Sequence, residues 1–473
     1  MNSEDCTVIS FQTIRLALSE PELRRHLALD IAQRCSAPIA RASTVGIAIL
    51  LWFAGPRPVF IRWLCWASRV GRGNLACRIA SGLGGELDRY ALDTLLARPG
   101  SGNWYQRCLI LCPPLIDETG LASRGVLLIK FTETVGLSGV ECDLPLLAEF
   151  FDVVLEPSWA GYCVEELLVW RRFPGVLVIQ ATDPDDRVVV ERLFPRAVCI
   201  AIGASNWVDY RCFHPTGADE LYGSVYVANL TPGKRVYRFF ETVVQLRQWY
   251  PAYRAALVVS SWGGEEGKAF VERLLEGYSL RGAVDVFVDL DQDGVNTVLN
   301  QSRVCVLLSR KEGSNKSLFE SMFAGTPGLL LSENIGVAKE FIPPVAGVVV
   351  PERRLIDTLQ GIQNGTLLQN CDSREWAVSR LAPEISAQAV AEAVKYGRRV
   401  LLEREGKHGK EEDVIVAPKV NSPEATYLRP SDNWMYLLRD QLLPLFLEAS
   451  DLTVAKRRLQ LHTLVQDASR HSG

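Results

Sequence analysis

The sequence lacks a long apolar run. Its most apolar stretch is VGIAILLWFA at residues 45–54. As a helix it would rise only about 15 Å, against roughly 30 Å for the hydrocarbon core of a bilayer. Pro56 and Pro58 follow this stretch, and proline stops a helix because it has no amide proton to donate. We therefore do not expect residues 45–54 to span a membrane.

An excess of positive charge is also missing. The 51 Lys and Arg residues stand against 55 Asp and Glu residues, which gives a net charge of −4. Proteins that bind nucleic acid usually carry a cationic surface, so no nucleic-acid partner is expected and any anion site must be local. Residues 31–85 are the local exception, with no acidic residue and seven arginines: Arg34, Arg41, Arg57, Arg62, Arg69, Arg72 and Arg78.

The 12 cysteines lack a metal-binding spacing. The closest pair, Cys108 and Cys112, lies four apart in a strand-like run rather than in a C-x-x-C pattern. The first residues, MNSEDCTVISFQ, are acidic and polar, whereas a signal peptide begins basic and continues apolar. Together these absences predict buried thiols in the reducing cytoplasm, without disulfides.

Residues 59–70, VFIRWLCWASRV, are expected to form an amphipathic helix. Arg62 and Arg69 are seven apart and share one helical face, and apolar residues cover the remainder (Phe60, Trp63, Leu64 and Trp66). Two interpretations stay open. The helix belongs to a core and turns its arginines to solvent, or it docks on an anionic lipid surface at the inner face of a membrane.

The rest of the chain predicts two α/β domains. From about Asn103, short apolar runs alternate with helical stretches, as in parallel sheets with crossover helices. The first series of strands comprises residues 107–112, 125–131, 151–157, 175–181 and 197–203; the second comprises 223–230, 255–261, 284–289, 303–309, 326–331 and 346–350. We expect a helical, Arg-rich extension (1–100), two Rossmann-like domains (101–214 and 215–405), and a charged linker with a helical tail (406–473).

Residues 309–327, SRKEGSNKSLFESMFAGTP, carry the sharpest local signal. The pattern places Glu312 in a loop after a strand, lets Ser314 or Asn315 cap a helix, and brings Glu320 about two turns later. The first amides of a helix bind anions, and Lys316 adds a positive charge there against the helix dipole. The alternative is a solvated surface helix, because two glutamates eight apart are common.

This segment resembles the E-x7-E region of retaining GT-B glycosyltransferases of family 4. Six residues match the pattern S-x-x-E-G-x6-E-x4-G-x-P: Ser309, Glu312, Gly313, Glu320, Gly325 and Pro327. The resemblance implies an α/β GT-B fold, with two Rossmann-like parallel-sheet domains facing a cleft. It also implies hexosyl transfer from a nucleotide-sugar to a saccharide or lipid-linked saccharide acceptor, with retention and without a metal or other cofactor.

The same resemblance implies roles for single residues. Glu320 would hold the ribose and Glu312 would approach the donor sugar. Upstream, YVANLTPGKRVYRFF resembles the region where the family places an Arg and a Lys on the donor phosphates; Lys234 matches the lysine, whereas Asn229 stands where Arg is usual. We predict Glu312 and Lys234 as catalytic, and a donor site of Glu320, Lys234, Arg235, Gly313, Ser314, Asn315 and Lys316, in which Arg235 or Lys316 supplies the missing charge.

The N-terminal domain offers weaker acceptor candidates, because it lacks the Gly-rich loop and His of many family members. Open α/β sheets bind ligands at the carboxyl ends of strands, which points to Lys130, Glu133, Glu156, Trp159 and Tyr162. Aromatic residues there stack on sugars or pack in the core. A non-catalytic GT-B scaffold and a nucleotide-sugar epimerase remain alternative functions.

One acidic motif is discounted. Asp289, Asp291 and Asp293 precede Gly294 as in a calcium loop, but Asn300 stands where the bidentate Glu is required. The same residues resemble a D-x-D metal motif, yet they follow a strand of the second domain, where a donor-domain loop is expected. We predict no metal site here.

Overall fold

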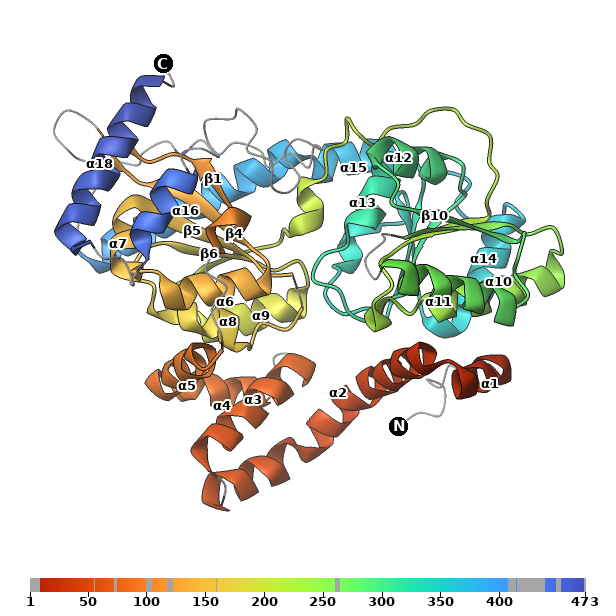
Figure 1. Ribbon diagram of the computed structural model, residues 1–473, viewed down its shortest axis with the longest axis horizontal. Helices are drawn as coiled ribbons and strands as arrows, with labels where there is room; N and C mark the ends of the chain where they lie inside the picture. Colours follow the sequence, from red (N-terminus) through yellow and green to blue (C-terminus); the bar gives the residue numbers. More distant parts are fainter. Residues whose placement is uncertain are drawn as a thin grey trace. The chain divides into compact units, whose positions relative to one another are not determined.

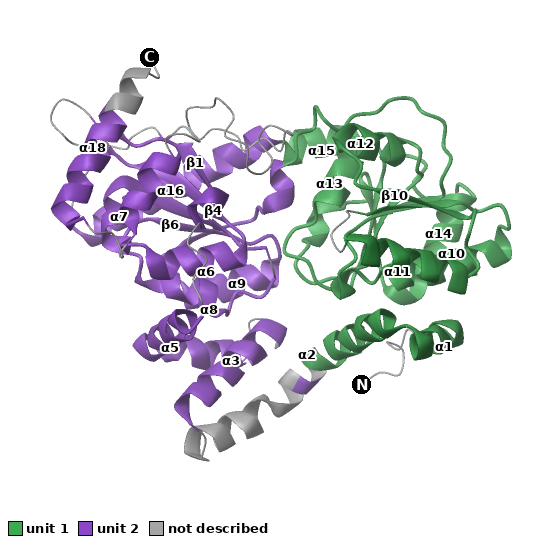
Figure 2. Cartoon of the chain, viewed as in Figure 1, with its two compact units in different colours: residues 1–36, 208–382 green, residues 37–207, 383–473 purple. Residues whose placement is uncertain are grey.

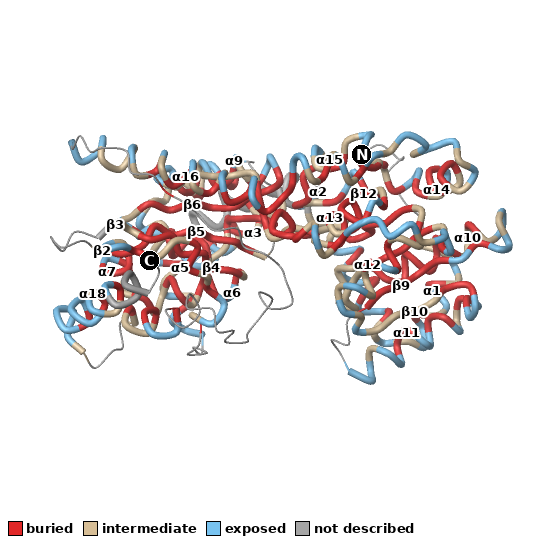
Figure 3. Tube along the Cα trace, turned by 90° about the horizontal axis from the view of Figure 1, so that it is seen from above, coloured by how far each residue is buried: buried red, intermediate tan, exposed pale blue. Residues whose placement is uncertain are grey.

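The computed structural model describes residues 9–54, 56–71, 75–98, 104–116, 122–158, 160–259, 264–406, 414, 439–447 and 452–471. The chain divides into two compact units, shown in Figure 2: unit 1 comprises residues 1–36 and 208–382, and unit 2 comprises residues 37–207 and 383–473. Each unit holds a sheet covered by helices (Figure 1). Buried strands and exposed helix faces alternate along both units (Figure 3).

Unit 1 is built on a six-stranded parallel sheet of order β10-β9-β8-β11-β12-β13. Its strands are β8 (Ser224–Val227), β9 (Ala255–Val259), β10 (Val284–Val288), β11 (Cys305–Leu307), β12 (Gly328–Leu331) and β13 (Gly347–Val350). These short, apolar runs suit a sheet that helices cover on both faces. The strand order reverses between β8 and β11, and open parallel sheets bind ligands beside such a switch point, at the carboxyl ends of the strands.

The helices of unit 1 include two from the N-terminus of the chain. Those of the sheet domain are α10 (Val236–Trp249), α11 (Gly264–Gly277), α12 (Gln292–Asn300), α13 (Lys316–Phe323), α14 (Leu355–Gln363) and α15 (Ser373–Leu381). The N-terminal arm is α1 (Phe11–Ser19) and residues 21–36 of α2 (Pro21–Ala54). Leu23 and Leu27 of α2 join the unit 1 core, and Gln12 donates to the Gly277 carbonyl at 2.9 Å.

Unit 2 has a five-stranded sheet of order β1-β4-β5-β6-β7. The strands are β1 (Cys108–Cys112), β4 (Gly125–Lys130), β5 (Phe151–Glu156), β6 (Leu177–Gln180) and β7 (Val198–Ile200). The prediction of an entirely parallel sheet is wrong at one edge, because β1 pairs antiparallel with β4. The described residues of the chain between them include a two-stranded ribbon, β2–β3 (Leu115–Ile116 and Ala122–Ser123). A parallel pair would need a crossover of a dozen or more residues, usually a helix.

The predicted domain limits differ from the compact units. The helix α16 (Pro383–Arg404), expected with the second domain, belongs to unit 2. Its residues Val390 and Val394 share a core cluster with Val178 of β6. Residues 1–100 divide between the units at position 36. The other helices of unit 2 are α3 (Arg57–Gly71), α4 (Leu75–Gly82), α5 (Gly85–Leu96), α6 (Thr132–Glu141), α7 (Leu144–Phe150), α8 (Glu165–Leu168), α9 (Pro184–Leu193) and α18 (Val454–His471).

The helix predicted at residues 59–70 forms as α3, and its apolar face packs in unit 2. Phe60 and Leu64 are buried, and Trp63 and Trp66 pack against the same core. Arg57 pairs with Glu86 at 2.6 Å. These contacts favour the interpretation as a core helix. Among the described residues, no helix has both the length and the apolarity to cross a membrane.

The described cysteines are free thiols, as expected. They are not all buried, however, since Cys35 is exposed and Cys112, Cys199, Cys212 and Cys371 are only half-buried. The fold class itself is confirmed: the chain is α/β, with two Rossmann-like units and a helical N-terminal region.

Candidate functional site

The switch point of the unit 1 sheet brings two predicted catalytic residues together. Lys234 follows β8, and Glu312 follows the adjacent strand β11. The Lys234 ammonium donates to both carboxylate oxygens of Glu312, at 2.6 Å to Oε1 and 2.7 Å to Oε2. The side chains are 20% and 8% exposed, so water screens this ion pair only partly.

A tight turn holds Lys234 at this position. Pro232–Lys234 forms a short 3-10 helix, η4, and the buried Tyr226 hydroxyl donates to the Lys234 carbonyl at 2.5 Å. Asn229 accepts from the amide and hydroxyl of Thr231, at 3.1 and 2.6 Å. Asn229 therefore shapes the turn through a local side-chain bond, and it brings no charge to the place where the family usually has Arg.

The loop that carries Glu312 is fixed by backbone bonds to the segment after β12. The Glu312 amide donates to the Ile335 carbonyl at 2.8 Å, and the Ile335 amide donates to the Arg310 carbonyl at 2.7 Å. The Asn334 side chain donates to the Ser309 carbonyl at 2.8 Å. The Ser309 side chain is buried in this loop. The position of Glu312 thus depends on two backbone hydrogen bonds and one bond from a side chain to the backbone, and not on the Glu312 side chain alone.

The residues that begin α13 lie as the sequence predicts, and Asn315 is the cap. Its side-chain oxygen accepts from the Leu318 amide at 3.1 Å and from the Ser317 hydroxyl at 2.7 Å. Gly313 and Ser314 lie in the loop before the cap, and Lys316 is the first residue of the helix. This arrangement leaves cationic character at the start of α13.

Glu320 lies in the second turn of α13 and is half-buried. Within the described part of the chain, its carboxylate accepts no hydrogen bond and forms no ion pair. Burial raises the pKa of Glu320 to about 7, against the opposing effect of the Lys316 charge. A carboxyl in this state gains from a ligand that donates hydrogen bonds, because donors stabilise its ionised form.

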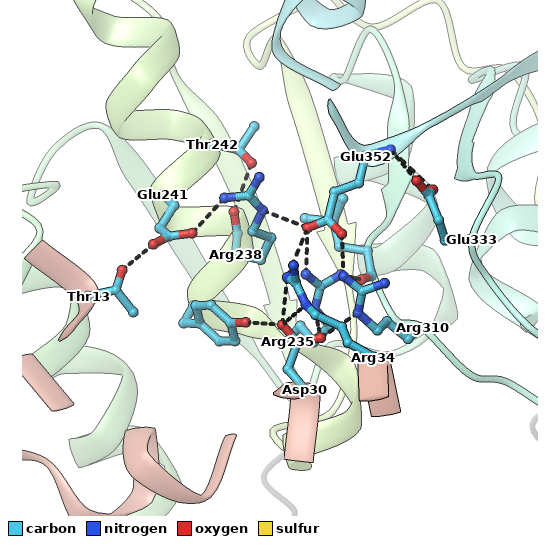
Figure 4. Close-up of polar contacts among 12 residues, drawn as sticks. Thr13, Asp30, Arg34, Arg235, Arg238, Glu241, Thr242, Arg310, Glu333 and Glu352 are labelled. Atoms are coloured by element: carbon cyan, nitrogen blue, oxygen red, sulfur yellow. Dashed lines mark hydrogen bonds and ion pairs between the residues drawn. The ribbon is translucent and has the colours of Figure 1, made fainter. Parts of the chain in front are cut away.

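The prediction that Arg235 binds the donor is wrong. Its side chain is fully buried and pairs with Glu352 at 2.5 Å and with Asp30 at 3.1 Å (Figure 4). The guanidinium also donates to the Leu308 carbonyl at 2.8 Å. All of these partners are groups of the protein itself. Arg235 therefore has a structural role, and it does not supply the positive charge that is missing at Asn229.

Residues 218–364 match the family model "Glycosyl transferases group 1". The matched segment lies in unit 1 and contains Lys234, Glu312 and Glu320. It confirms the resemblance to glycosyltransferases that the sequence motif indicates. Membership of family 4 in particular stays a prediction.

Several solved glycosyltransferase structures are similar to this chain. A variant of TarM from S. aureus is similar over 53% of this chain and 51% of its own length, with 13% identity and a TM-score of 0.41. HepE from Anabaena is similar over 58% of this chain and 78% of its own length, with 12% identity and a TM-score of 0.44. Sucrose-phosphate synthase from Thermosynechococcus elongatus is similar over 60% of this chain and 74% of its own length, with 19% identity and a TM-score of 0.45. This chain spans about half the length of TarM, and no curated protein sequence matches it.

The acceptor candidates in unit 2 fall into two groups. Lys130 and Glu156 are register partners at the ends of β4 and β5, and both are buried. Glu133 is exposed in the first turn of α6. Tyr162 is a correction, because it is 3% exposed and its hydroxyl donates to the Gln180 carbonyl at 2.6 Å. It packs in the core rather than facing a sugar, and Trp159 lies outside the described residues.

The acidic motif Asp289, Asp291 and Asp293 contributes a helix cap. Asp291 caps α12 by accepting from the Gly294 amide at 2.8 Å. Among the described residues, no group of His, Cys, Asp and Glu has the arrangement of a metal site. The sequence therefore offers a helix cap where its spacing imitates a metal motif.

Sequence reasoning missed three residues beside the site. They are Asp30 of α2, Arg310 of the Glu312 loop and Glu352 after β13, and Arg310 forms ion pairs with both carboxylates. Asp30 is separated from Arg310 by 280 positions, so no local pattern predicts their contact. The one available signal is that Asp30 is the last acidic residue before the arginine-rich stretch 31–85.

Proposed function

We propose that this protein is a retaining, metal-independent hexosyltransferase that transfers a sugar from a nucleotide-sugar to a saccharide or lipid-linked saccharide acceptor. One observation carries the proposal. Lys234 and Glu312 form an ion pair at the switch point of the unit 1 sheet, inside the segment that matches the group 1 glycosyltransferases. Glu320 stands on the helix that follows the same loop.

Glu320 suits the ribose of the donor. Two vicinal hydroxyls donate to one carboxylate in a charge-assisted pair. Burial raises the pKa of Glu320 to about 7. This direction is expected for a carboxylate that has few hydrogen-bond donors to stabilise its ionised form. A bound ribose would supply them, so nucleotide binding and ionisation of Glu320 support each other.

Lys234 suits the diphosphate. A lysine ammonium has three protons, and two of them point to the oxygens of Glu312. The third is available for a phosphate oxygen. A cation fixed beside the leaving nucleotide stabilises the negative charge that grows in the transition state. Lys316, at the start of α13, adds a second positive charge near the same loop.

The pairing of Glu312 fits retention without an enzyme nucleophile. A carboxylate held at 2.6 and 2.7 Å by an ammonium is a poorer nucleophile than an isolated one. In the proposed reaction, Glu312 orients Lys234 and contacts the donor sugar. The departing phosphate oxygens accept the proton of the acceptor hydroxyl on the same face of the sugar.

A thermal unfolding panel tests the donor site. Wild type is measured in EDTA with UDP, GDP, ADP, dTDP and CMP. A nucleotide at about 100 times its Kd should stabilise the protein by roughly 2.7 kcal/mol. Glu320→Gln should abolish the shift, whereas Glu265→Gln, a change at an exposed glutamate of α11, should retain it. No shift with any nucleotide would contradict the proposal.

Asn229 favours a second candidate, a binding protein without turnover. It is uncharged and serves the turn, so the usual two-cation clamp is incomplete. Release of free sugar or of nucleotide from a labelled donor distinguishes the two. An enzyme hydrolyses or transfers, a scaffold binds only, and an epimerase converts the donor sugar without releasing nucleotide.

Membrane association is a separate part of the proposal, for a lipid-linked acceptor. Arg62 of α3 is exposed, although the aromatic residues of that helix pack inward. Sedimentation with anionic vesicles tests it: replacing Arg57, Arg62 and Arg69 by Glu should reduce binding, and unchanged binding would remove this part.

A further inference from the structure

Four charged side chains of unit 1, Asp30, Arg235, Glu352 and Arg310, form a closed ring of ion pairs (Figure 4). Asp30 contacts Arg310 at 2.5 Å and Arg235 at 3.1 Å. Glu352 contacts the same two arginines, at 2.6 and 2.5 Å. Each carboxylate therefore bridges both arginines, and each arginine is held by both carboxylates.

Neighbouring side chains complete the ring. Arg34 approaches Asp30 at 2.9 Å, and the Tyr237 hydroxyl donates to Asp30 at 2.7 Å. Arg238 pairs with Glu352 at 3.0 Å and with Glu241 at 2.7 Å. Burial opposes the charge of Asp30, but the adjacent arginines outweigh it and hold its pKa well below the ordinary value. Asp30 is therefore an anion buried among cations.

The ring joins pieces of chain that carry the candidate site. Arg235 directly follows Lys234, and Arg310 precedes Glu312 by two residues. Asp30 comes from α2, in the N-terminal arm, and Glu352 comes after β13. The distance between the Lys234 turn and the Glu312 loop thus depends on a carboxylate from an arm that lies outside the sheet.

The backbone at Arg235 makes this dependence stronger. Arg235 has φ = 54° and ends the η4 turn immediately before α10. This conformation is strained for a residue other than glycine, and it persists where the surrounding structure holds it. The two carboxylates of the ring provide that restraint, because they bind the guanidinium of the same residue.

We propose that Asp30 is a positioning residue: by bridging Arg235 and Arg310 it sets Lys234 and Glu312 for the phosphates of the bound nucleotide. This inference rests on the proposed function. The N-terminal arm is then a working part of the donor site. Loss of the Asp30 charge should weaken binding of the phosphates more than binding of the nucleoside, because Lys234 is the residue proposed to bind the phosphates.

The test compares two ligands on the same full-length protein. Isothermal titration gives the affinity for the nucleotide that stabilises wild type and for the corresponding nucleoside. In Asp30→Asn the preference for the nucleotide should fall about tenfold or more. Asp30→Glu, which keeps the charge, should recover part of it. The matched control is Glu20→Gln, which removes an arm carboxylate that binds Arg273 at 2.9 Å and takes no part in the ring.

The inference is overturned if folded Asp30→Asn prefers nucleotide over nucleoside to within twofold of wild type. It is also overturned if Glu20→Gln loses as much of this preference as Asp30→Asn does. If Asp30→Asn does not fold, Tyr237→Phe replaces it: this variant removes only the hydroxyl that donates to Asp30. A roughly threefold loss of preference then supports the inference, and no loss overturns it. A wild type that binds no nucleotide overturns the proposed function itself, which is a different result.

Discussion

The two sheets treat the carboxyl ends of their strands differently. In unit 1, Lys234 and Glu312 pair at the switch point and are backed by the ring of Asp30, Arg235, Glu352 and Arg310. In unit 2, Lys130 and Glu156 also end adjacent strands, and both side chains are buried. A site for a fixed group such as a nucleotide diphosphate gains from charges held in place, whereas a variable acceptor does not require them.

The units share one unusual feature of backbone. In each unit, one residue directly before a helix has a positive φ: 68° at Phe131 before α6, and 54° at Arg235 before α10. In unit 1 ion pairs restrain that residue; in unit 2 the Phe131 ring lies 5.1 Å from the guanidinium of Arg107 and 5.5 Å from the ammonium of Lys130. The two residues thus differ in the contacts that their side chains make.

The largest expected difference lies between the two strand-end lysines. Lys234→Met should reduce donor turnover about 10²–10³-fold, as loss of a preorganised charge at the reacting centre usually does. Lys130→Met should leave nucleotide affinity unchanged, because that lysine belongs to unit 2. Titration calorimetry and release of nucleotide from the labelled donor measure both. Equal losses of nucleotide affinity would end the assignment of donor binding to unit 1.

A second comparison uses buried carboxylates. Glu352→Gln and Asp152→Asn each remove a charge that is nearly inaccessible and paired with arginines, Arg398 approaching Asp152 at 2.6 Å. Breaking a buried pair typically costs about 3–5 kcal/mol, because the partner charge stays buried. Both variants should unfold earlier in urea. Only Glu352→Gln should also weaken nucleotide binding, and a similar loss in Asp152→Asn would contradict the role given to the ring.

The arm itself should respond to pH. His26 of α2 is fully buried and packs on Phe270. Burial lowers its pKa from 6.5 to about 4. The unfolded chain binds the proton first as pH falls, so stability should decline between pH 6.5 and 4, by at most roughly 3 kcal/mol.

Urea unfolding at several pH values checks the His26 effect. His26→Phe should remove this part of the pH dependence, and His214→Gln, at an exposed histidine of the same unit, should keep it. The same decline in wild type and His26→Phe would show that another group causes it.

Local patterns predicted much of this molecule, and contacts distant in sequence account for the rest. Apolar runs between turns predicted each main strand, and Asn315 is a cap because a helix start needs an acceptor. Arg235 was misjudged because its burial depends on Glu352, 117 positions away. The direction of β1 was missed because it depends on the connection to β4, whose described residues form a two-stranded ribbon.

The pH dependence of nucleotide affinity tests the role proposed for Glu320 in unit 1. The pKa of Glu320 is raised to about 7, and the proposed ribose contact requires its ionised form. Affinity should therefore fall as pH drops below 7, by up to about tenfold per unit. Glu320→Gln should bind weakly with little pH dependence. Calorimetry between pH 5.5 and 8.5 measures this, and a wild-type affinity that is flat over that range would exclude the ribose role.

The smallest effect expected is a gain. Asn229→Arg places a positive charge on the turn before Lys234, and it removes the bond that Asn229 accepts from the Thr231 amide. A partly solvent-exposed charge pair is worth up to about 1 kcal/mol, so nucleotide affinity should rise only a few-fold. Asn229→Ala, which loses the turn bond without adding charge, separates the two contributions. If Asn229→Arg weakens binding as much as Asn229→Ala, the turn matters more for nucleotide affinity than the missing charge. Unit 1 would then bind the phosphates with Lys234 alone, held in place by the ring of ion pairs.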